Sequence, residues 1–131
     1  MTIVPLSEEN VQLFSQTAAK ILPEAWSFET YKKQLSNPDD ISFLALCNGE
    51  AAGFISVWCV CGEAEINNIG VLEKFRRMGI AKALFDSAYN VQMWLLHKTR
   101  LCGQAKEVAK VRHELRNSNG KDLDRYEQAE M

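Results

Sequence analysis

The strongest constraint on the fold is a pair of apolar segments joined by a tight turn. Ile41–Cys47 and Ala51–Cys61 flank Asn48-Gly49, a dipeptide typical of a two-residue β-hairpin turn. Both segments are apolar almost throughout, instead of alternating apolar and polar residues. A strand with two apolar faces needs cover on both. The hairpin therefore predicts a central sheet with helices packed on each side.

Apolar residues at helical spacing precede the hairpin. Val11, Phe14 and Ala18 recur at intervals of three or four residues, which predicts a helix that ends before Pro23. Ser7 is a candidate for its N-cap, because a serine side chain accepts hydrogen bonds from the first turn.

A second, short helix is predicted from Ser27 to the Asn37-Pro38 pair, and a short strand over residues 2–4. After the hairpin, Glu63–Val71 has the composition of a third strand, and helical spacing begins at about Ile80.

The remaining sequence predicts another strand at Val108–Arg116 and a last helix at Lys121–Met131. The element order is then β-α-α-β-β-β-α-β-α. A chain of 131 residues is of single-domain size. We predict one α/β domain over residues 1–131, with a mixed, mostly antiparallel central sheet and helices on both faces.

Composition narrows the possible partners. The formal net charge of -2 argues against a dedicated nucleic-acid binder. Residues 98–121, however, contain seven Lys or Arg and only two Glu. This local excess of positive charge indicates either a solvated helical face or a docking surface for an anionic partner such as ribosomal RNA.

The longest apolar run, residues 51–61, has about half the length needed to cross a bilayer, so no membrane partner is expected. The N-terminal residues also lack the pattern of an export signal.

The four cysteines lie in apolar or helical surroundings rather than at the spacings of a disulfide framework. This favours reduced thiols and a cytoplasmic location. Cys59 and Cys61 form a pair, but no second pair completes a zinc site, so no metal is expected.

The segment Arg76–Ala81, with the sequence RRMGIA, joins the third strand to the following helix. Gly79 lets the backbone approach a ligand, and Ala81 keeps the first helical turn free of bulk. The free N–H groups at a helix start form an anion site, to which Arg76 and Arg77 add charge suited to phosphate. The turn therefore predicts a phosphate-binding site.

This region resembles the GNAT acetyltransferase superfamily, whose pyrophosphate signature is Gln/Arg-x-x-Gly-x-Gly/Ala. Arg76, Gly79 and Ala81 match it, and Ile69-Gly70-Val71 resembles the family's strand end. The resemblance implies acetyl-coenzyme A as co-substrate. It places the pantetheine arm against the strand end, and the pyrophosphate in the turn and the helix start. The implied coenzyme-binding residues are Ile69, Gly70, Val71, Arg76, Arg77, Met78, Gly79, Ile80 and Ala81.

Further segments resemble the ribosomal-protein-alanine N-acetyltransferases. They are Ala25-Trp26-Ser27, Asn67–Val71, the run from His113 to Asn119, and Tyr126-Glu127. In that family a catalytic Glu and Tyr are twelve residues apart, as Glu114 and Tyr126 are in this chain. The resemblance also lets Asn119 touch the coenzyme.

The implied chemistry uses no covalent intermediate. An α-amino group has a pKa near ~8, so a base is needed to free its lone pair at neutral pH. By resemblance Glu114 is that base and Tyr126 protonates the leaving thiolate. The backbone N–H of Val71 is the natural donor to the developing oxyanion.

The chain departs from the family in two places. Residues 89–104 exceed the expected length, and they either lengthen the third helix or form an additional one. Their apolar Met93–Leu96 stretch is expected to be exposed and so suggests a homodimer.

The family also continues past the Tyr-Glu helix with two more strands, so the domain is predicted to be shortened at its C-terminus. An open strand edge would remain. Either a second chain pairs with it, or the remaining elements repack, or the form is truncated and inactive.

Three functions follow. The leading hypothesis is transfer of acetyl to a protein N-terminus, with a ribosomal protein as acceptor. The second is transfer to a small amine. The third is a catalytically silent module that binds coenzyme A or a partner.

Overall fold

The computed structural model describes residues 1–60 and 63–102, with the backbone alone over residues 96–102. The elements are β1 (Thr2–Pro5), α1 (Val11–Ile21), α2 (Phe28–Gln34), β2 (Phe43–Cys47), β3 (Glu50–Val60), β4 (Glu63–Val71), the 3-10 helix η1 (Glu73–Phe75) and α3 (Ile80–Cys102). The strand and helix predicted at 108–116 and 121–131 lie outside the described residues, as do Glu114, Asn119 and Tyr126.

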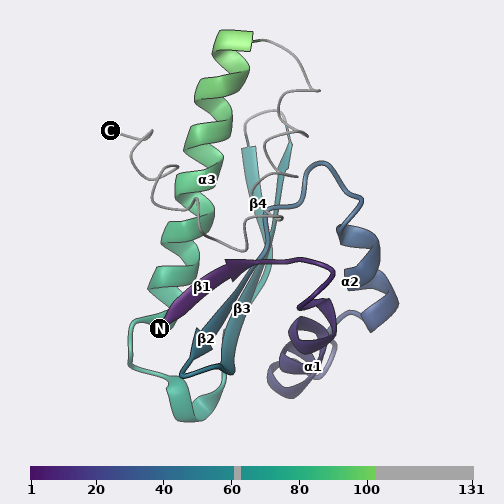
Figure 1. The fold of residues 1–131 in the computed structure, drawn as a ribbon, viewed down its shortest axis with the longest axis vertical. Helices are drawn as coiled ribbons and strands as arrows, with labels where there is room; N and C mark the ends of the chain where they lie inside the picture. The colour runs from purple at the N-terminus through teal and green to yellow at the C-terminus, as the bar shows by residue number, and fades with distance from the viewer. Residues whose placement is uncertain (61–62, 103–131) are drawn as a thin grey trace.

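The sheet has the order β1-β2-β3-β4, and each neighbouring pair is antiparallel. Figure 1 shows α3 on one face of the sheet and α1 with α2 on the other. The predicted GNAT-like arrangement, a mostly antiparallel sheet between helices, is confirmed. Within the described residues no pair of strands is parallel.

The hairpin that constrains the fold forms as predicted. Asn48 and Gly49 both have left-handed backbones, with φ values of 53° and 80°. Two such residues in succession are the signature of the turn whose twist matches antiparallel strands. β2 and β3 are buried along most of their lengths, because each of their faces packs against helices.

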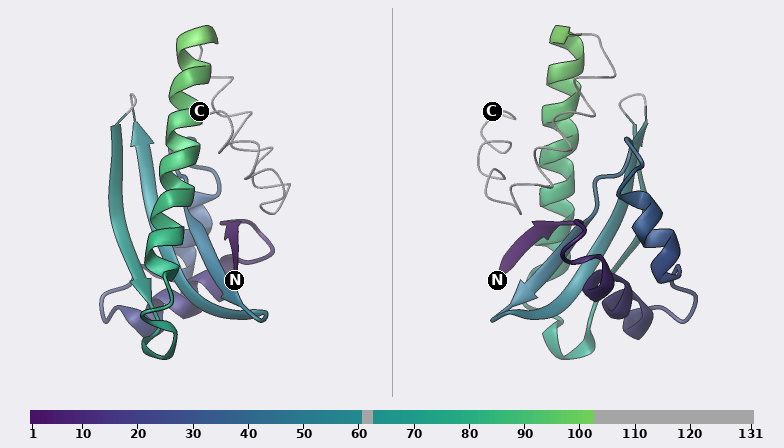
Figure 2. Two further views of the ribbon diagram at one scale, coloured as in Figure 1. Left: turned by 90° about the vertical axis from the view of Figure 1, so that its left-hand side faces the viewer. Right: turned by 45° about the vertical axis from the view of Figure 1, so that its right-hand side comes forward.

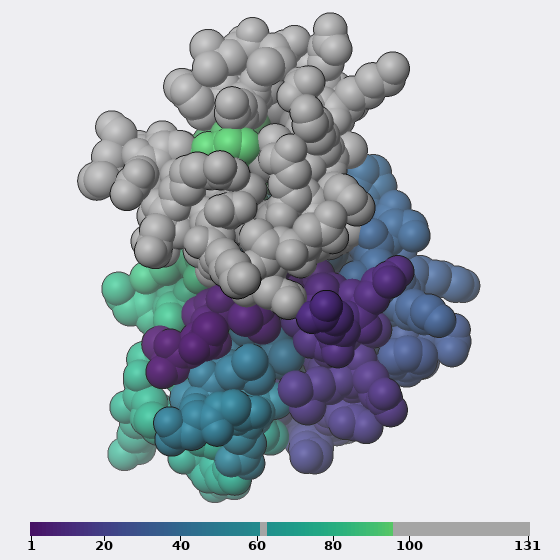
Figure 3. All heavy atoms as spheres, in the orientation of Figure 1, coloured from purple at the N-terminus to yellow at the C-terminus, as the bar shows by residue number. Residues whose placement is uncertain are grey.

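The two faces of the hairpin support separate cores. Ile55 and Val57 of β3 pack with Leu84 and Val91 of α3. On the opposite face Phe54 packs with residues of α1 and α2. Figure 2 shows the sheet between these two helical layers from two further directions. In the space-filling view β1 and the hairpin tip separate the surface of α3 from that of α1 (Figure 3).

The first helix begins later than Ser7 suggested. Asn10 precedes α1, and its side chain folds back onto Ser7 N and Pro5 O, at 2.8 Å each, instead of capping the helix. The Ser7 carbonyl accepts hydrogen bonds from Asn10 N and Val11 N. The prediction of a Ser7 cap is therefore wrong. By contrast Ser27 caps α2, accepting from Thr30 N at 3.2 Å.

The additional segment lengthens the third helix. α3 runs without a break as far as Cys102. Trp94 and Leu95 are 8% and 2% exposed and belong to the core beside α3. The expected exposure of this stretch is wrong at these two residues, because they face the sheet. A homodimer through residues 89–104 or through the sheet edge stays a prediction. No described helix is long and apolar enough to cross a membrane.

Tyr31 is the largest fully buried side chain of the core beside α1. Its ring meets Phe14 edge-on at 5.1 Å and lies 5.5 Å from Trp26. The hydroxyl has no hydrogen-bond partner among the described residues. Burial raises the pKa of Tyr31 above 10.0, while the nearby backbone of Trp26 offsets part of the rise without completing a hydrogen bond of normal geometry.

We expect Tyr31→Phe to be neutral or stabilising by up to about 1 kcal/mol at pH 7, because the lost hydroxyl has no partner. An unfolded tyrosine ionises near pH ~10, whereas buried Tyr31 keeps its proton to higher pH. Stability from this group is complete below pH ~10 and falls above it. Urea unfolding of both proteins between pH 7 and pH 11 measures the effect. A difference that stays constant above pH ~10 would contradict the buried phenol.

Candidate functional site

The chain between β4 and α3 is a tight, exposed turn. It runs through η1 to Arg77, whose φ of 66° is left-handed, and to Gly79, whose φ is 79°. A non-glycine residue in this region costs about 1–2 kcal/mol, so the strain at Arg77 must be offset by the surrounding structure. Gly79 adopts the same region without that penalty. Nothing lies within 4 Å of the point where a Gly79 Cβ would be.

The N-terminus of α3 opens directly on this turn. The Gly79 carbonyl accepts from Ala83 N at 3.0 Å, so Gly79 occupies the N-cap position of the helix. The first N–H groups of a helix have no acceptor within it. Here they belong to Ile80, Ala81 and Lys82. The Ile80 side chain is buried in the core and Ala81 is small and exposed. The backbone donors are therefore accessible beside an open glycine, as an anion requires.

The two arginines of the turn differ in position. Arg76 Nε donates to the Val71 carbonyl at 3.2 Å, which ties the turn to the end of β4. A guanidinium has further donors, and Arg76 is exposed. Arg77 and Met78 are exposed as well. The predicted phosphate-binding residues Arg76–Ala81 thus lie together, while the second role of Arg76 as a strap across the turn was not predicted.

β4 is paired on one side only within the described residues, where it forms the edge of the sheet next to β3. Its pairing contains a bulge. Ser56 is opposite Asn68 and Val57 is opposite Ile66, which leaves Asn67 unpaired. A bulge inserts one residue and resets the alternation of faces.

The bulge keeps apolar side chains on the α3 face at both of its ends. Val71 belongs to the core beside α3. A Cβ at Gly70 would lie 2.5 Å from Ile21 Cγ2, so Gly70 faces α1 and Ile69, its neighbour, faces α3. Beyond the bulge Ala64 and Ile66 again face α3. The predicted residues Ile69, Gly70 and Val71 therefore present alternate faces at the strand end.

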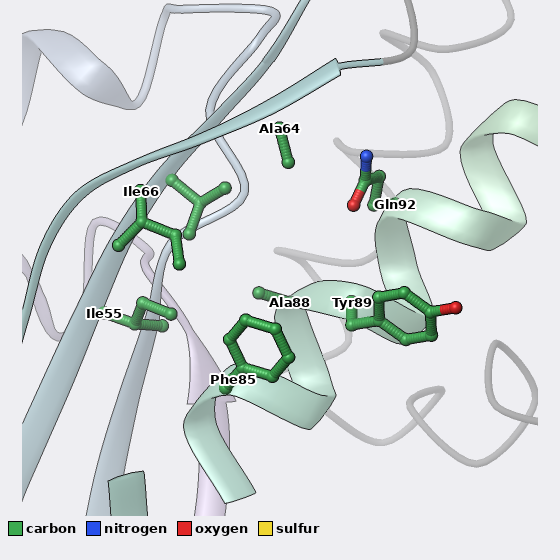
Figure 4. A pocket seen from close by; sticks show the side chains of 8 residues that line it. Ile55, Ala64, Ile66, Phe85, Ala88, Tyr89 and Gln92 are labelled. Atoms are coloured by element: carbon green, nitrogen blue, oxygen red, sulfur yellow. The ribbon is translucent and has the colours of Figure 1, made fainter. Parts of the chain in front are cut away.

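An apolar hollow of about 240 Å³ lies between β4 and α3. Ile55 and Ile66 from the strands and Phe85 and Ala88 from α3 point toward it (Figure 4). Phe85 and Tyr89 stack with ring centroids 6.4 Å apart at its rim.

A larger and more polar hollow of about 570 Å³ lies on the opposite face of β4. It opens between this strand and the connection from α1 to α2. It is lined by Leu22, Pro23, Glu24, Trp26, Glu65, Ile66, Asn67 and Asn68. The sequence analysis singled out Trp26 in a segment that resembles the ribosomal-protein-alanine N-acetyltransferases but missed Glu24, Glu65 and the bulge. The three-residue step from Ile66 to Ile69 was the available signal, since it breaks the period of a regular strand.

The structure does not place the turn relative to Glu114, Asn119 or Tyr126, which lie outside the described residues. In the described part no group of three or more His, Cys, Asp or Glu side chains is arranged to hold a metal ion.

The profile of the Acetyltransferase (GNAT) family matches residues 8–95, more than half of the chain. The chain therefore belongs to the GNAT acetyltransferase family. The match covers both helical layers, the bulged strand and the turn. No curated protein sequence matches the chain significantly.

Solved structures share the fold. The ribosomal-protein-S18-alanine N-acetyltransferase from Escherichia coli has a TM-score of 0.62 at 23% identity, covering 70% of this chain and 59% of that one. The aminoglycoside N-acetyltransferase AAC(6')-Iy in complex with CoA has a TM-score of 0.59 at 21% identity, covering 67% and 66%. NAA60 from Arabidopsis thaliana in complex with acetyl-CoA has a TM-score of 0.54 at 21% identity, covering 65% and 63%. The chain thus spans about three fifths of the Escherichia coli enzyme.

The bulge gives a direct test of the two faces of β4. Deleting Asn67 would exchange the faces of residues 63–66, which brings Glu65 beneath α3 and turns Ile66, already 44% exposed, away from α3. We expect a loss of about 2 kcal/mol or more in the free energy of unfolding. Asn67→Ala keeps the bulge and removes an amide nitrogen that has no partner among the described residues. It should stay within about 1 kcal/mol of wild type. Equal urea unfolding curves for both variants would show that the bulge does not set the faces.

Proposed function

We propose that this chain binds acetyl-coenzyme A at the Arg76–Ala81 turn and transfers the acetyl group to a primary amine. The observation that carries the proposal is the open start of α3, where backbone N–H groups, an unobstructed glycine and two arginines lie together. That donor set fits a pyrophosphate, which takes several charge-assisted hydrogen bonds at once. Family membership supports the same ligand.

The bound coenzyme supplies an activated acetyl group as a thioester. The strand end at Ile69–Val71 leads into the turn, so an arm extending from the pyrophosphate would follow β4. In the proposal the Val71 N–H donates to the oxyanion that forms on the thioester carbonyl. Glu114 takes the proton of the acceptor amine, and Tyr126 protonates the departing thiolate. Asn119 adds a contact to the coenzyme.

The proposed acceptor is a protein N-terminus, in particular the alanine of a ribosomal protein. The support is the resemblance of the Glu114 and Tyr126 segments to that class, together with the fold shared with the Escherichia coli enzyme. A small amine is the second candidate, since the fold is also shared with an aminoglycoside N-acetyltransferase. The proposal places the chain in the cytoplasm, where the buried thiols of Cys47 and Cys59, which form no disulfide within the described residues, would stay reduced.

Substitution of two glycines that have the same backbone conformation tests the coenzyme site. Gly79 and Gly49 have φ values of 79° and 80°, and a Cβ at either would meet nothing within 4 Å. Gly79→Trp and Gly49→Trp should therefore lose similar stability, about 1 kcal/mol each. Only Gly79→Trp should abolish coenzyme A binding in calorimetry, because its indole would occupy the pyrophosphate position. Tight binding by Gly79→Trp would mean that the coenzyme sits elsewhere.

The transfer step is tested by release of free thiol from acetyl-coenzyme A with a panel of N-terminal peptides and small amines. We expect Glu114→Gln to lower kcat by about 100-fold or more, and Tyr126→Phe to lower it less, with coenzyme affinity unchanged. Glu107→Gln makes the same charge change nearby and should keep full activity. Coenzyme binding without turnover for any acceptor would favour the silent module.

A further inference from the structure

The polar hollow on the α1 side of β4 is next to the strand end that the proposed coenzyme arm would follow. Asn67 and Asn68 line it and directly precede Ile69–Val71. Its volume of about 570 Å³ is of the size of a small-molecule site or a few peptide residues. An amine bound in this hollow would therefore reach β4 from the face opposite α3.

The charge of the hollow is one-sided. Among the described residues, two ionisable side chains line it: Glu24, from the connection between α1 and α2, and Glu65, from β4. Both are exposed. Neither has an ion-pair partner within the described part of the chain, where the recorded pairs are Lys74 with Glu50 and Lys82 with Asp86. None of the described Lys or Arg residues lines this space. Two unpaired carboxylates facing one hollow favour a cationic occupant.

The wall beside the carboxylates is held in place. Trp26 stacks on Trp58, with ring centroids 5.8 Å apart and 30° between the planes. Trp58 Nε1 in turn donates to Gln34 Oε1 at 2.7 Å. A side chain fixed in this way loses little entropy when an occupant binds beside it.

The lining residue Asn67 and Ser56, which pairs with the lining residue Asn68, carry unsatisfied polar groups. The buried Asn67 Nδ2 and the Oγ of Ser56, which is 1% exposed, have no hydrogen-bond partner among the described residues. Both flank the bulge, since Ser56 pairs with Asn68. Buried polar groups without partners are costly and concentrate at functional sites. The two carboxylates, the Trp26 indole and the bulged residue Asn67 therefore all line the same hollow.

We infer that the acceptor carries a second positive charge beside the amine that is acetylated. Glu24 and Glu65 hold this second cation beside Trp26, while the reacting amine points along β4 toward Val71. The inference rests on the proposed transfer function and names its acceptor class. A basic side chain close to a peptide N-terminus and a small polyamine offer the same chemistry.

Two matched pairs of acceptors test the inference and separate its sources. One pair is a peptide beginning Ala-Lys-Lys and its Ala-Gln-Gln counterpart. The other is 1,4-diaminobutane and butylamine. In at least one pair the acceptor with the additional positive charge should be preferred by about tenfold in kcat/KM, and 0.5 M salt should reduce the preference. The pair that shows the preference identifies whether the second charge belongs to a peptide side chain or to a small polyamine. Equal rates within both pairs overturn the inference.

Variants assign the preference to the hollow. Glu24→Gln and Glu65→Gln should each lower it about threefold, and the double variant should nearly remove it. Glu8→Gln makes the same charge change just before the opposite end of α1, whose 11 residues make a helix about 16 Å long. It should leave the preference intact. A preference that survives the double variant would place its origin elsewhere.

Binding measurements separate this inference from the proposed function. Calorimetry of each amine with the protein, with and without saturating coenzyme A, reports charge selectivity without turnover. Absent coenzyme binding would overturn the proposed function while amine selectivity is still read directly. Normal coenzyme binding and turnover with no selectivity for dications would overturn only the inference.

Discussion

Burial of both faces of β3 is the constraint on which the rest of the structure depends. Phe54 and Ile55 are adjacent, and both are fully buried on opposite faces. Each such side chain contributes about 1.5–3 kcal/mol only if a helical layer covers it. The chain therefore has to supply helices on both sides, which it does with α1 and α2 before the hairpin and α3 after β4. β4 then occupies the edge of the described sheet, and both of its faces are available for hollows.

The geometry of the proposed phosphate site follows from where α3 must start. β4 ends at Val71 with α1 behind it, and the next helix has to cross to the opposite face. The turn is short, so the chain takes left-handed conformations at Arg77 and Gly79. The hydrogen bond from Arg76 to the Val71 carbonyl keeps the turn in this conformation. The free N–H groups of α3 are thereby fixed beside the strand end. Preorganisation of this kind lowers the entropic cost of binding an anion.

Local signals were sufficient for the hairpin, the Ser27 cap and the Arg76–Ala81 turn, because each depends on the chemistry of a few adjacent residues. Tertiary contacts decided the failures. Asn10 bonds to Pro5 and Ser7 and delays α1 by a turn. Trp94 and Leu95 look like an exposed apolar stretch in sequence, but the length of α3 carries them over the sheet. The bulge depends on the register between β4 and β3. Glu24 and Glu65 line the same hollow only because the fold brings together two segments that are far apart in the chain.

The bulge at Asn67 is what gives one strand two chemically different sides. Without the bulge, regular alternation along β4 would place Glu65 on the α3 face and Ile66 on the α1 face. With it, the α3 face is apolar from Ala64 to Val71, while carboxylate and amide groups gather on the α1 face. The proposed thioester arm and the proposed cationic acceptor would need such opposite surroundings, and they would still have to meet at one carbonyl. A single inserted residue in an edge strand meets both requirements, because it changes which side chains face each way and leaves the strand end at Val71 in register with Gly53.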